Sequence, residues 1–201
     1  MDTLSAILEN KLVAIIRGAH DIPAVVEALY AGGVRVIEIT LNSPDPFRTI
    51  ADLNHTWGDQ LLVGAGTVLT VDDAKAAVHA GARFLISPHF DPAIIAATHS
   101  AGAISIPGAY TPTEIIAAHR AGADIVKVFP ASPAYFRDLK GPLSHIPMMP
   151  TGGVTLENIR EFYLSGAVAF GVGSALVGAG NATDAAVLTA RAESFIEAIQ
   201  P

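Results

Sequence analysis

The chain has 201 residues, 51% of them hydrophobic, which is enough to bury a large core and fits a single domain over residues 1–201 better than two. The absence of cysteine excludes disulfides, thiolate chemistry and thiolate metal sites, and we expect a cytoplasmic protein. A net charge of −7 without a Lys/Arg-rich tract argues against a nucleic-acid partner. The apolar runs are short and interrupted by Gly, Pro or charge, which argues against export and membrane spanning.

After a first helix expected over residues 2–9, the chain repeats one pattern. An Ala-rich segment of helical character is followed by a stop containing Gly and then by a short apolar run. Gly just past a helix suits a left-handed cap, and the apolar run suits a strand buried on both faces. The repeat therefore predicts a parallel α/β fold. The five stops are Tyr30-Ala-Gly-Gly-Val34, His79-Ala-Gly-Ala-Arg83, Ser100-Ala-Gly-Ala-Ile104, Arg120-Ala-Gly-Ala-Asp124 and Leu164-Ser-Gly-Ala-Val168.

Eight apolar runs predict eight strands. They cover residues 12–17, 36–41, 61–68, 84–88, 104–107, 125–129, 148–151 and 169–173. Caps, early prolines or first-turn acids predict helix starts at Pro23, Asp45-Pro46, Thr70, Asp91-Pro92, Thr111-Pro112 and Thr155, and a last helix is expected over residues 183–200. Eight such units predict a (β/α)₈ barrel with flanking N- and C-terminal helices. An open doubly wound sheet is the alternative, disfavoured by the strand count and by the lack of a dinucleotide fingerprint.

Lys127 is the most informative residue, because it lies in the middle of the apolar segment Asp124-Ile-Val-Lys-Val-Phe-Pro130. A buried lysine is costly unless it is paired or neutral, and a neutral amine is a nucleophile that can form an imine with a ketone. The other three lysines, Lys11, Lys75 and Lys140, lie in contexts typical of solvated side chains. A purely structural pairing of Lys127 with an internal carboxylate is the alternative.

Glu38 is a second charged residue inside an apolar strand, in Val36-Ile-Glu-Ile-Thr-Leu41. It lies near the C-terminal end of that strand, where barrel enzymes place their catalytic groups, and shares a face with Thr40. A carboxylate beside Lys127 could move protons while an imine forms and breaks. A structural Lys127–Glu38 pair remains the alternative.

Arg17 ends the first predicted strand, and its planar guanidinium suits a substrate carboxylate. Pairing with Glu38 is the structural alternative. Thr67, in Val63-Gly-Ala-Gly-Thr-Val68, and Pro88 are expected to line the same pocket from the third and fourth strands.

Glycines follow the last two predicted strands, in Pro150-Thr-Gly-Gly-Val-Thr155 and Gly171-Val-Gly-Ser-Ala175. Barrels bind phosphate at these two strand ends through backbone N–H groups and a short helix, so the pair predicts a phosphorylated substrate. Glycines that simply end a strand tightly are the alternative. No metal is predicted: His79, His99 and His119 fall on expected helices without ligand spacing, and only His89 ends a strand.

Together these motifs resemble the class I 2-keto-3-deoxy-6-phosphogluconate (KDPG) aldolases, with their 4-hydroxy-2-oxoglutarate (KHG) and 6-phosphogalactonate relatives, over nearly the whole chain. The resemblance implies that Lys127 forms the Schiff base, that Glu38 moves protons and that Arg17 and Thr67 hold the pyruvate part. It further implies a pocket with Pro88, Phe129 and Thr151, a phosphate site, no cofactor and a homotrimer. The phosphate residues implied are Gly152, Gly153, Gly173 and Ser174.

The implied activity is reversible cleavage of KDPG to pyruvate and glyceraldehyde 3-phosphate, with 4-hydroxy-2-oxoglutarate as a further substrate. Segment Leu41-Asn-Ser-Pro-Asp-Pro-Phe47 is similar to the galactonate branch, whereas Thr151 is similar to the gluconate branch, which we favour. Asn42 also replaces an arginine found in some gluconate-type members. The alternatives are the galactonate aldolase, an imine-free phosphosugar isomerase or epimerase, and a non-catalytic phosphosugar-binding barrel.

Overall fold

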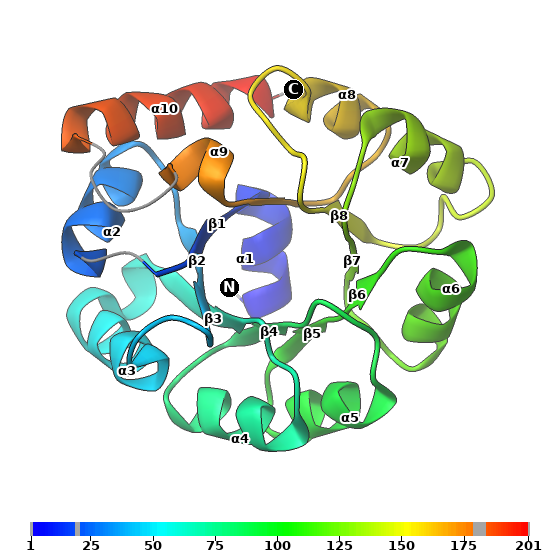
Figure 1. Cartoon of the computed structure of the whole chain (residues 1–201), viewed down its shortest axis with the longest axis horizontal. Helices are drawn as coiled ribbons and strands as arrows, with labels where there is room; N and C mark the ends of the chain where they lie inside the picture. Colours follow the sequence, from blue (N-terminus) through cyan, green and yellow to red (C-terminus); the bar gives the residue numbers. More distant parts are fainter. Residues whose placement is uncertain (1, 19–20, 179–183, 201) are drawn as a thin grey trace.

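The computed structural model describes residues 2–18, 21–178 and 184–200, and its strands form two parallel sheets. The larger sheet has the order β5-β4-β3-β2-β1-β9 and the smaller one β6-β7-β8. In Figure 1 the strands surround a common centre and the connecting helices lie outside them. The strands are β1 (Leu12–Ile16), β2 (Val36–Thr40), β3 (Leu62–Gly66), β4 (Phe84–Ile86), β5 (Ile104–Ile106), β6 (Gly108–Ala109), β7 (Val126–Val128), β8 (Met148–Pro150) and β9 (Phe170–Val172).

The helices alternate with the strands, as the repeated sequence pattern predicts. Two begin with a complete capping box, at Thr70 and Thr111, and five carry proline in the first turn. The helices are α1 (Thr3–Asn10), α2 (Ile22–Ala31), α3 (Pro46–Trp57), the 3₁₀ turn η1 (Gly58–Gln60), α4 (Val71–His79), α5 (Pro92–Ser100), α6 (Pro112–Arg120), α7 (Pro133–Lys140), α8 (Ile159–Leu164), α9 (Ser174–Val177) and α10 (Ala185–Ala198). In the described ranges, no helix has the length and apolarity needed to cross a membrane.

Backbone contacts join the two sheets at both ends. An isolated parallel bridge pairs Thr151, just after β8, with Gly171 of β9. At the other end, β5 and β6 are separated only by Pro107, whose carbonyl accepts a hydrogen bond from Lys127 N–H of β7 at 2.9 Å. The strands therefore run as one parallel series around the centre (Figure 1).

Alternate residues of each strand face opposite sides, as strand geometry requires. One set packs against the helices in the larger apolar cluster, for example Ile37, Ile39 and Val126. The other set faces the enclosed centre, where a second, separate cluster includes Val36, Phe84 and others. Glu38 and Lys127 continue the inward-facing set of their strands, one step beyond Val36 and Ile125, so the strand period directs both charges to the centre.

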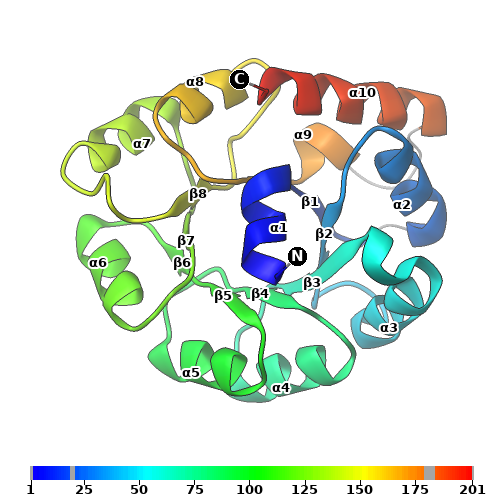
Figure 2. The same ribbon diagram turned by 180° about the vertical axis from the view of Figure 1, so that it is seen from behind.

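Helix α1 covers one end of this centre. Figure 2 shows it lying across the strands on the side where they begin. Its Ile7 is fully buried and belongs to the central cluster with Val13, Val36 and Leu62. The helix therefore fills the N-terminal end, which leaves the C-terminal end of the strands as the side where a pocket can open.

Apart from β6, the observed strands lie within the predicted apolar runs, and α1 and α10 fall where flanking helices are expected; Thr183 lies outside the described residues. The short strand β6 was not predicted. The helix start at Thr155 is wrong: residues 155–158 form a turn, and α8 begins only at Ile159. In that turn Thr155 donates its backbone N–H to Asn158 Oδ1, and its carbonyl accepts from the N–H groups of Asn158 and Ile159.

Candidate active site

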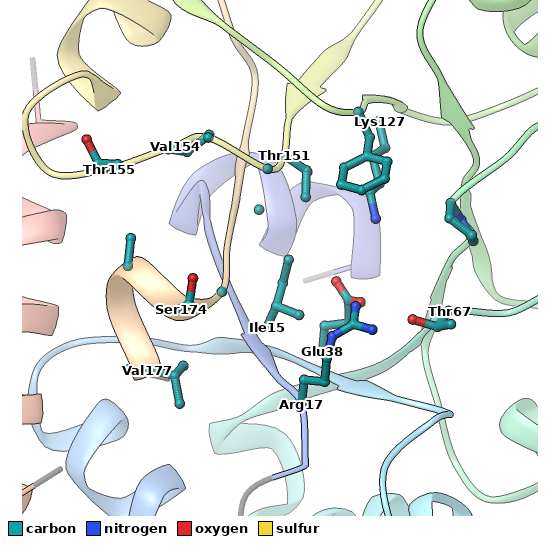
Figure 3. Close-up of a pocket in the computed structure, with 18 residues that line it drawn as sticks. Ile15, Arg17, Glu38, Thr67, Lys127, Thr151, Val154, Thr155, Ser174 and Val177 are labelled. Atoms are coloured by element: carbon teal, nitrogen blue, oxygen red, sulfur yellow. The ribbon is translucent and has the colours of Figure 1, made fainter. Parts of the chain in front are cut away.

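A cavity of about 540 Å³ opens at the C-terminal end of the strands (Figure 3). All eleven residues expected at the site line it, and they come from seven strands or the segments that follow them. They are Arg17, Glu38, Thr67, Pro88, Lys127, Phe129, Thr151, Gly152, Gly153, Gly173 and Ser174. The remaining lining residues are Ile15, Val154, Thr155, Gly171, Ala175, Val177 and Gly178.

Lys127 extends from β7 into the cavity, and its side chain is only 6% exposed. Its Nζ lies 4.9 Å from the ring centroid of Phe129, which stands at the mouth and is 39% exposed. Burial lowers the pKa of the Lys127 ammonium below its ordinary value; the charge of Glu38 opposes this shift and that of Arg17 adds to it. The environment thus favours the neutral, nucleophilic amine.

Glu38 extends toward Lys127 from β2 and is 1% exposed (Figure 3). Its Oε2 atom has no hydrogen-bond partner in the protein. Burial raises the pKa of this carboxyl group, although Lys127 and Arg17 pull it down. Across the described residues, no ion pair within 4.0 Å joins Glu38 to Lys127 or Arg17. The structural pairings considered as alternatives are therefore not formed, and the carboxyl group can exchange a proton with a molecule in the cavity.

Arg17 follows β1, and its side chain reaches the cavity beside Glu38 (Figure 3). Its Nη1 donates to Asn42 Oδ1 at 3.3 Å, and the next residue, Gly18, donates its N–H to Ser43 Oγ at 3.0 Å. Ser43 Oγ is also 3.0 Å from Thr40 Oγ1. These contacts attach the segment after β1 to the segment after β2, so that the guanidinium is held at the rim.

Thr67, immediately after β3, has a φ of 59° and lies in the left-handed region. A β-branched residue is rarely found there, because its side chain crowds the backbone. Such conformations cost about 1–3 kcal/mol and cluster at functional sites. Here the conformation turns the chain so that Thr67 lines the cavity opposite Ser174 (Figure 3).

The other side of the cavity is built from the glycine-containing segments after β8 and β9. Gly152 and Gly153 have φ values of 70° and 88°, which only glycine adopts readily. The short helix α9 begins at Ser174, in the place where barrels put a phosphate-binding helix. Thr151 is 4% exposed, and its Oγ1 has no partner in the protein. Buried hydroxyls without partners are uncommon, which sets this lining residue apart.

Several residues considered at the sequence level lie outside the site. His89 is exposed and is not among the residues that line the cavity. Lys140 is not simply solvated: its ammonium is half-buried and donates to the carbonyls of Ser144 and Ile146, both at 3.2 Å. Within the described ranges, no group of three or more His, Cys, Asp or Glu side chains could hold a metal ion.

Some lining residues were not predicted. Ile15 could have been, since it lies two residues before Arg17 and strand alternation puts both on one face. Val154 and Val177 carry no such signal, because their positions depend on the turn after β8 and on α9. Asn42 does not line the cavity but contacts Arg17, and this contact forms only because the loops after β1 and β2 meet in space.

The fold and site thus define a parallel α/β protein with a buried lysine and a buried carboxyl group at the C-terminal end of its strands. Residues 4–190 match the family of KDPG and KHG aldolases. A probable 2-dehydro-3-deoxy-6-phosphogalactonate aldolase of Rhizobium meliloti (strain 1021) is 37% identical over 84% of this chain and 82% of its own length. A 2-dehydro-3-deoxy-phosphogluconate aldolase of Treponema pallidum (strain Nichols) is 34% identical over 75% of this chain and 73% of its own.

Solved structures agree with this match. One described as native KDPGal has a TM-score of 0.87 and 33% identity, over 93% of each chain. KDPG aldolase from Legionella pneumophila, with pyruvate captured as a covalent carbinolamine intermediate, has a TM-score of 0.79 and 28% identity, covering 98% of this chain and 96% of that one. A cage designed by fusing symmetric oligomeric domains has a TM-score of 0.86 and 32% identity, over 94% and 71%. The chain belongs to the KDPG and KHG aldolase family and is a Schiff-base aldolase.

Proposed function

We propose that the protein cleaves a six-carbon 2-keto-3-deoxy-6-phospho sugar acid into pyruvate and glyceraldehyde 3-phosphate, with Lys127 as the Schiff-base residue. The observation that carries this proposal is the cavity itself. It holds one buried lysine whose pKa is lowered by burial, and it faces a buried carboxyl group with an unpartnered oxygen. An imine needs such an amine, and its chemistry needs a group that moves protons beside it.

The reaction begins with attack of the neutral Lys127 Nζ on the C2 ketone. The carbinolamine loses water to give a protonated imine, with Glu38 supplying and accepting the protons. Glu38 then takes the proton of the C4 hydroxyl, and the C3–C4 bond breaks. The electron pair of the broken bond moves into the imine to form the enamine of pyruvate. Glyceraldehyde 3-phosphate then leaves. A proton returns to C3, and water hydrolyses the imine to release pyruvate and Lys127.

The other lining residues hold the substrate. Arg17 is placed to pair with the carboxylate, and Thr67 contacts the pyruvate part. At the far side, the backbone N–H groups of the two glycine segments and of the start of α9 bind the phosphate. Free N–H groups at helix N-termini and in glycine turns favour binding of such an anion. Pro88 and Phe129 also line the cavity. No step needs a metal or an organic cofactor.

For the sugar, we favour the gluconate epimer. The two epimers differ at C4, next to the bond that breaks, and the unpartnered Oγ1 of Thr151 offers a hydrogen bond to a substrate hydroxyl in this part of the cavity. Activity on 4-hydroxy-2-oxoglutarate is a further prediction. It should be weaker, because that substrate leaves the phosphate-binding side empty.

The galactonate epimer is the second candidate. It is favoured by the Rhizobium meliloti relative and by Asn42, which contacts Arg17 where some gluconate-type members have a second arginine. The test is pyruvate release from each pure epimer under the same conditions, with the wild type and with Thr151→Val. We expect higher kcat/KM for the gluconate epimer and a loss of that preference of about 10-fold or more in the variant, as removal of one substrate hydrogen bond would give. Faster cleavage of the galactonate epimer by the wild type would reverse the assignment.

We further propose that residues 1–201 form one closed (β/α)₈ barrel in which β5 and β6 together make the fifth strand, as the bridge from Thr151 to Gly171 and the single residue between β5 and β6 support. A homotrimer is proposed from the family. The similarity to a cage built from symmetric oligomeric domains supports an oligomer. Light scattering on the purified protein tests it, and a monomeric mass would contradict it.

A further inference from the structure

Gly66, the last residue of β3, raises the question of why this position is a glycine. Its φ is not in the left-handed region, so its backbone conformation is open to any residue. Glycine within a strand costs stability and commonly marks a place where another group approaches closely. The reason must therefore lie in the space above Gly66.

That space is filled by Glu38. A methyl group added to Gly66 would overlap Oε1 and Cδ of Glu38 and lie 2.6 Å from its Cγ. The backbone cannot retreat, because Gly66 pairs with Thr40 of β2 on one side and with Ile86 of β4 on the other. Any side chain added at Gly66 must therefore displace Glu38, and the space into which Glu38 can move is the cavity that it lines.

We propose that Gly66 is a positioning residue: because it lacks a side chain, it leaves free the space that the Glu38 carboxyl group occupies, here called the seat. The seat sets that group opposite Lys127. Its effect on activity rests on the proposed role of Glu38 in proton transfer. Its steric part rests on packing alone. The two parts can therefore be tested separately.

The variant Gly66→Ala should keep the fold but displace the carboxyl group. We expect kcat for cleavage to fall by about 10²-fold or more, within the range that a positioned proton-transfer group contributes. KM should change little, because Arg17 and the glycine segments remain in place. Trapping of pyruvate on Lys127 by borohydride should persist. In the Glu38→Gln background, Gly66→Ala should cause little further loss of kcat, since the group that it displaces is already disabled.

Gly64 provides a matched control. It lies on the same face of the same strand, two residues earlier, but the three atoms nearest to a methyl group there all belong to the buried ring of Phe84. Gly64→Ala should therefore lower the melting temperature while the folded fraction keeps its kcat and shows no special interaction with substitutions at Glu38.

A thermal double-mutant cycle tests the seat without any assay of activity. In the wild type, alanine at 66 is crowded by Glu38, whereas in Glu38→Ala it fills the space that the carboxyl group vacates. The change in melting temperature caused by Gly66→Ala should therefore be more favourable in the Glu38→Ala background. The gain that alanine brings by restricting the unfolded chain is common to both backgrounds and cancels. If Gly66→Ala alone fails to fold, the double variant decides, since it should melt no lower than Glu38→Ala.

The outcomes separate the two proposals. Equal temperature changes in both backgrounds, or full kcat in Gly66→Ala beside an impaired Glu38→Gln, would overturn the positioning role and leave the proposed function intact. Full kcat in Glu38→Gln itself would overturn the proposed role of Glu38. In that case the temperature cycle would still support or refute the seat.

Discussion

At the scale of single residues, the site combines two groups that are each costly to bury. Lys127 and Glu38 lie almost fully inside the protein, without an ion pair between them, and burial shifts each pKa toward the neutral form. Burial of both groups in one cavity lowers the free energy of unfolding but supplies the neutral amine and the proton-transfer group that imine chemistry needs.

The neighbours of Lys127 should shift its titration in opposite directions. Loss of the Arg17 cation in Arg17→Met should raise the pKa of Lys127, because Arg17 now lowers it. Loss of the Glu38 anion in Glu38→Gln should lower that pKa further, because Glu38 now raises it. The neutral amine forms as pH rises through the pKa, so the acidic limb of the rate of pyruvate trapping should move to higher pH in the first variant and to lower pH in the second. Shifts in the same direction would refute this electrostatic account.

Removal of both buried charges should stabilise the fold. We expect the double variant Glu38→Gln/Lys127→Met to be inactive and more stable than the wild type by about 1–4 kcal/mol, the range seen when buried charged groups are replaced by neutral ones. Because the pKa of Lys127 is lower in the folded than in the unfolded protein, this residue lowers the free energy of unfolding as pH falls. Because the pKa of Glu38 is higher in the folded protein, that residue lowers the free energy of unfolding as pH rises. The advantage should therefore be present in urea denaturation at neutral pH. A less stable double variant would contradict it.

At the scale of elements, the segments after β1 and β2 act as one unit at the rim. Asn42 accepts from Arg17, and Ser43 accepts from Gly18 while contacting Thr40. These are contacts between loops, which no strand or helix pattern predicts. The sequence does locate Arg17 and the ends of both strands, but not the hydrogen bonds that orient the guanidinium.

Asn42→Ala should loosen the guanidinium of Arg17. We expect KM for the sugar acid to rise several-fold with a smaller change in kcat, because a rim hydrogen bond contributes about 0.5–1.5 kcal/mol. Asn42→Asp keeps an acceptor for Arg17 and is the matched control; it should retain the contact but weaken carboxylate binding by its charge. Unchanged KM in Asn42→Ala would show that Arg17 is held by other means.

At the scale of the whole molecule, the strand and helix order was predictable because buried parallel strands and glycine-capped helices leave clear patterns. The inward direction of Glu38 and Lys127 followed from the strand period. Less predictable were features that depend on contact in space: the delayed start of α8, the half-buried Lys140, and the left-handed conformation of Thr67. The same holds for Gly66, whose importance appears only when the neighbouring strand places Glu38 over it.

Helix α1, which covers the N-terminal ends of the strands, should contribute to the stability of the fold but not to kcat. Ile7 of α1 is fully buried in the central cluster and does not line the cavity. Ile7→Ala should cost about 2–5 kcal/mol of folding stability, as large core truncations do, with kcat per folded molecule unchanged. Chemical denaturation and active-site titration measure the two quantities. A loss of kcat in the folded fraction would show that α1 also shapes the site.

The most direct test of the central claim is the mass of the protein after incubation with pyruvate and borohydride, followed by peptide mapping. A reduced pyruvyl adduct on Lys127, absent from Lys127→Met, is the predicted result. A folded protein without an adduct, or with the adduct on Lys11, Lys75 or Lys140, would contradict the assignment of Lys127 as the residue that forms the imine.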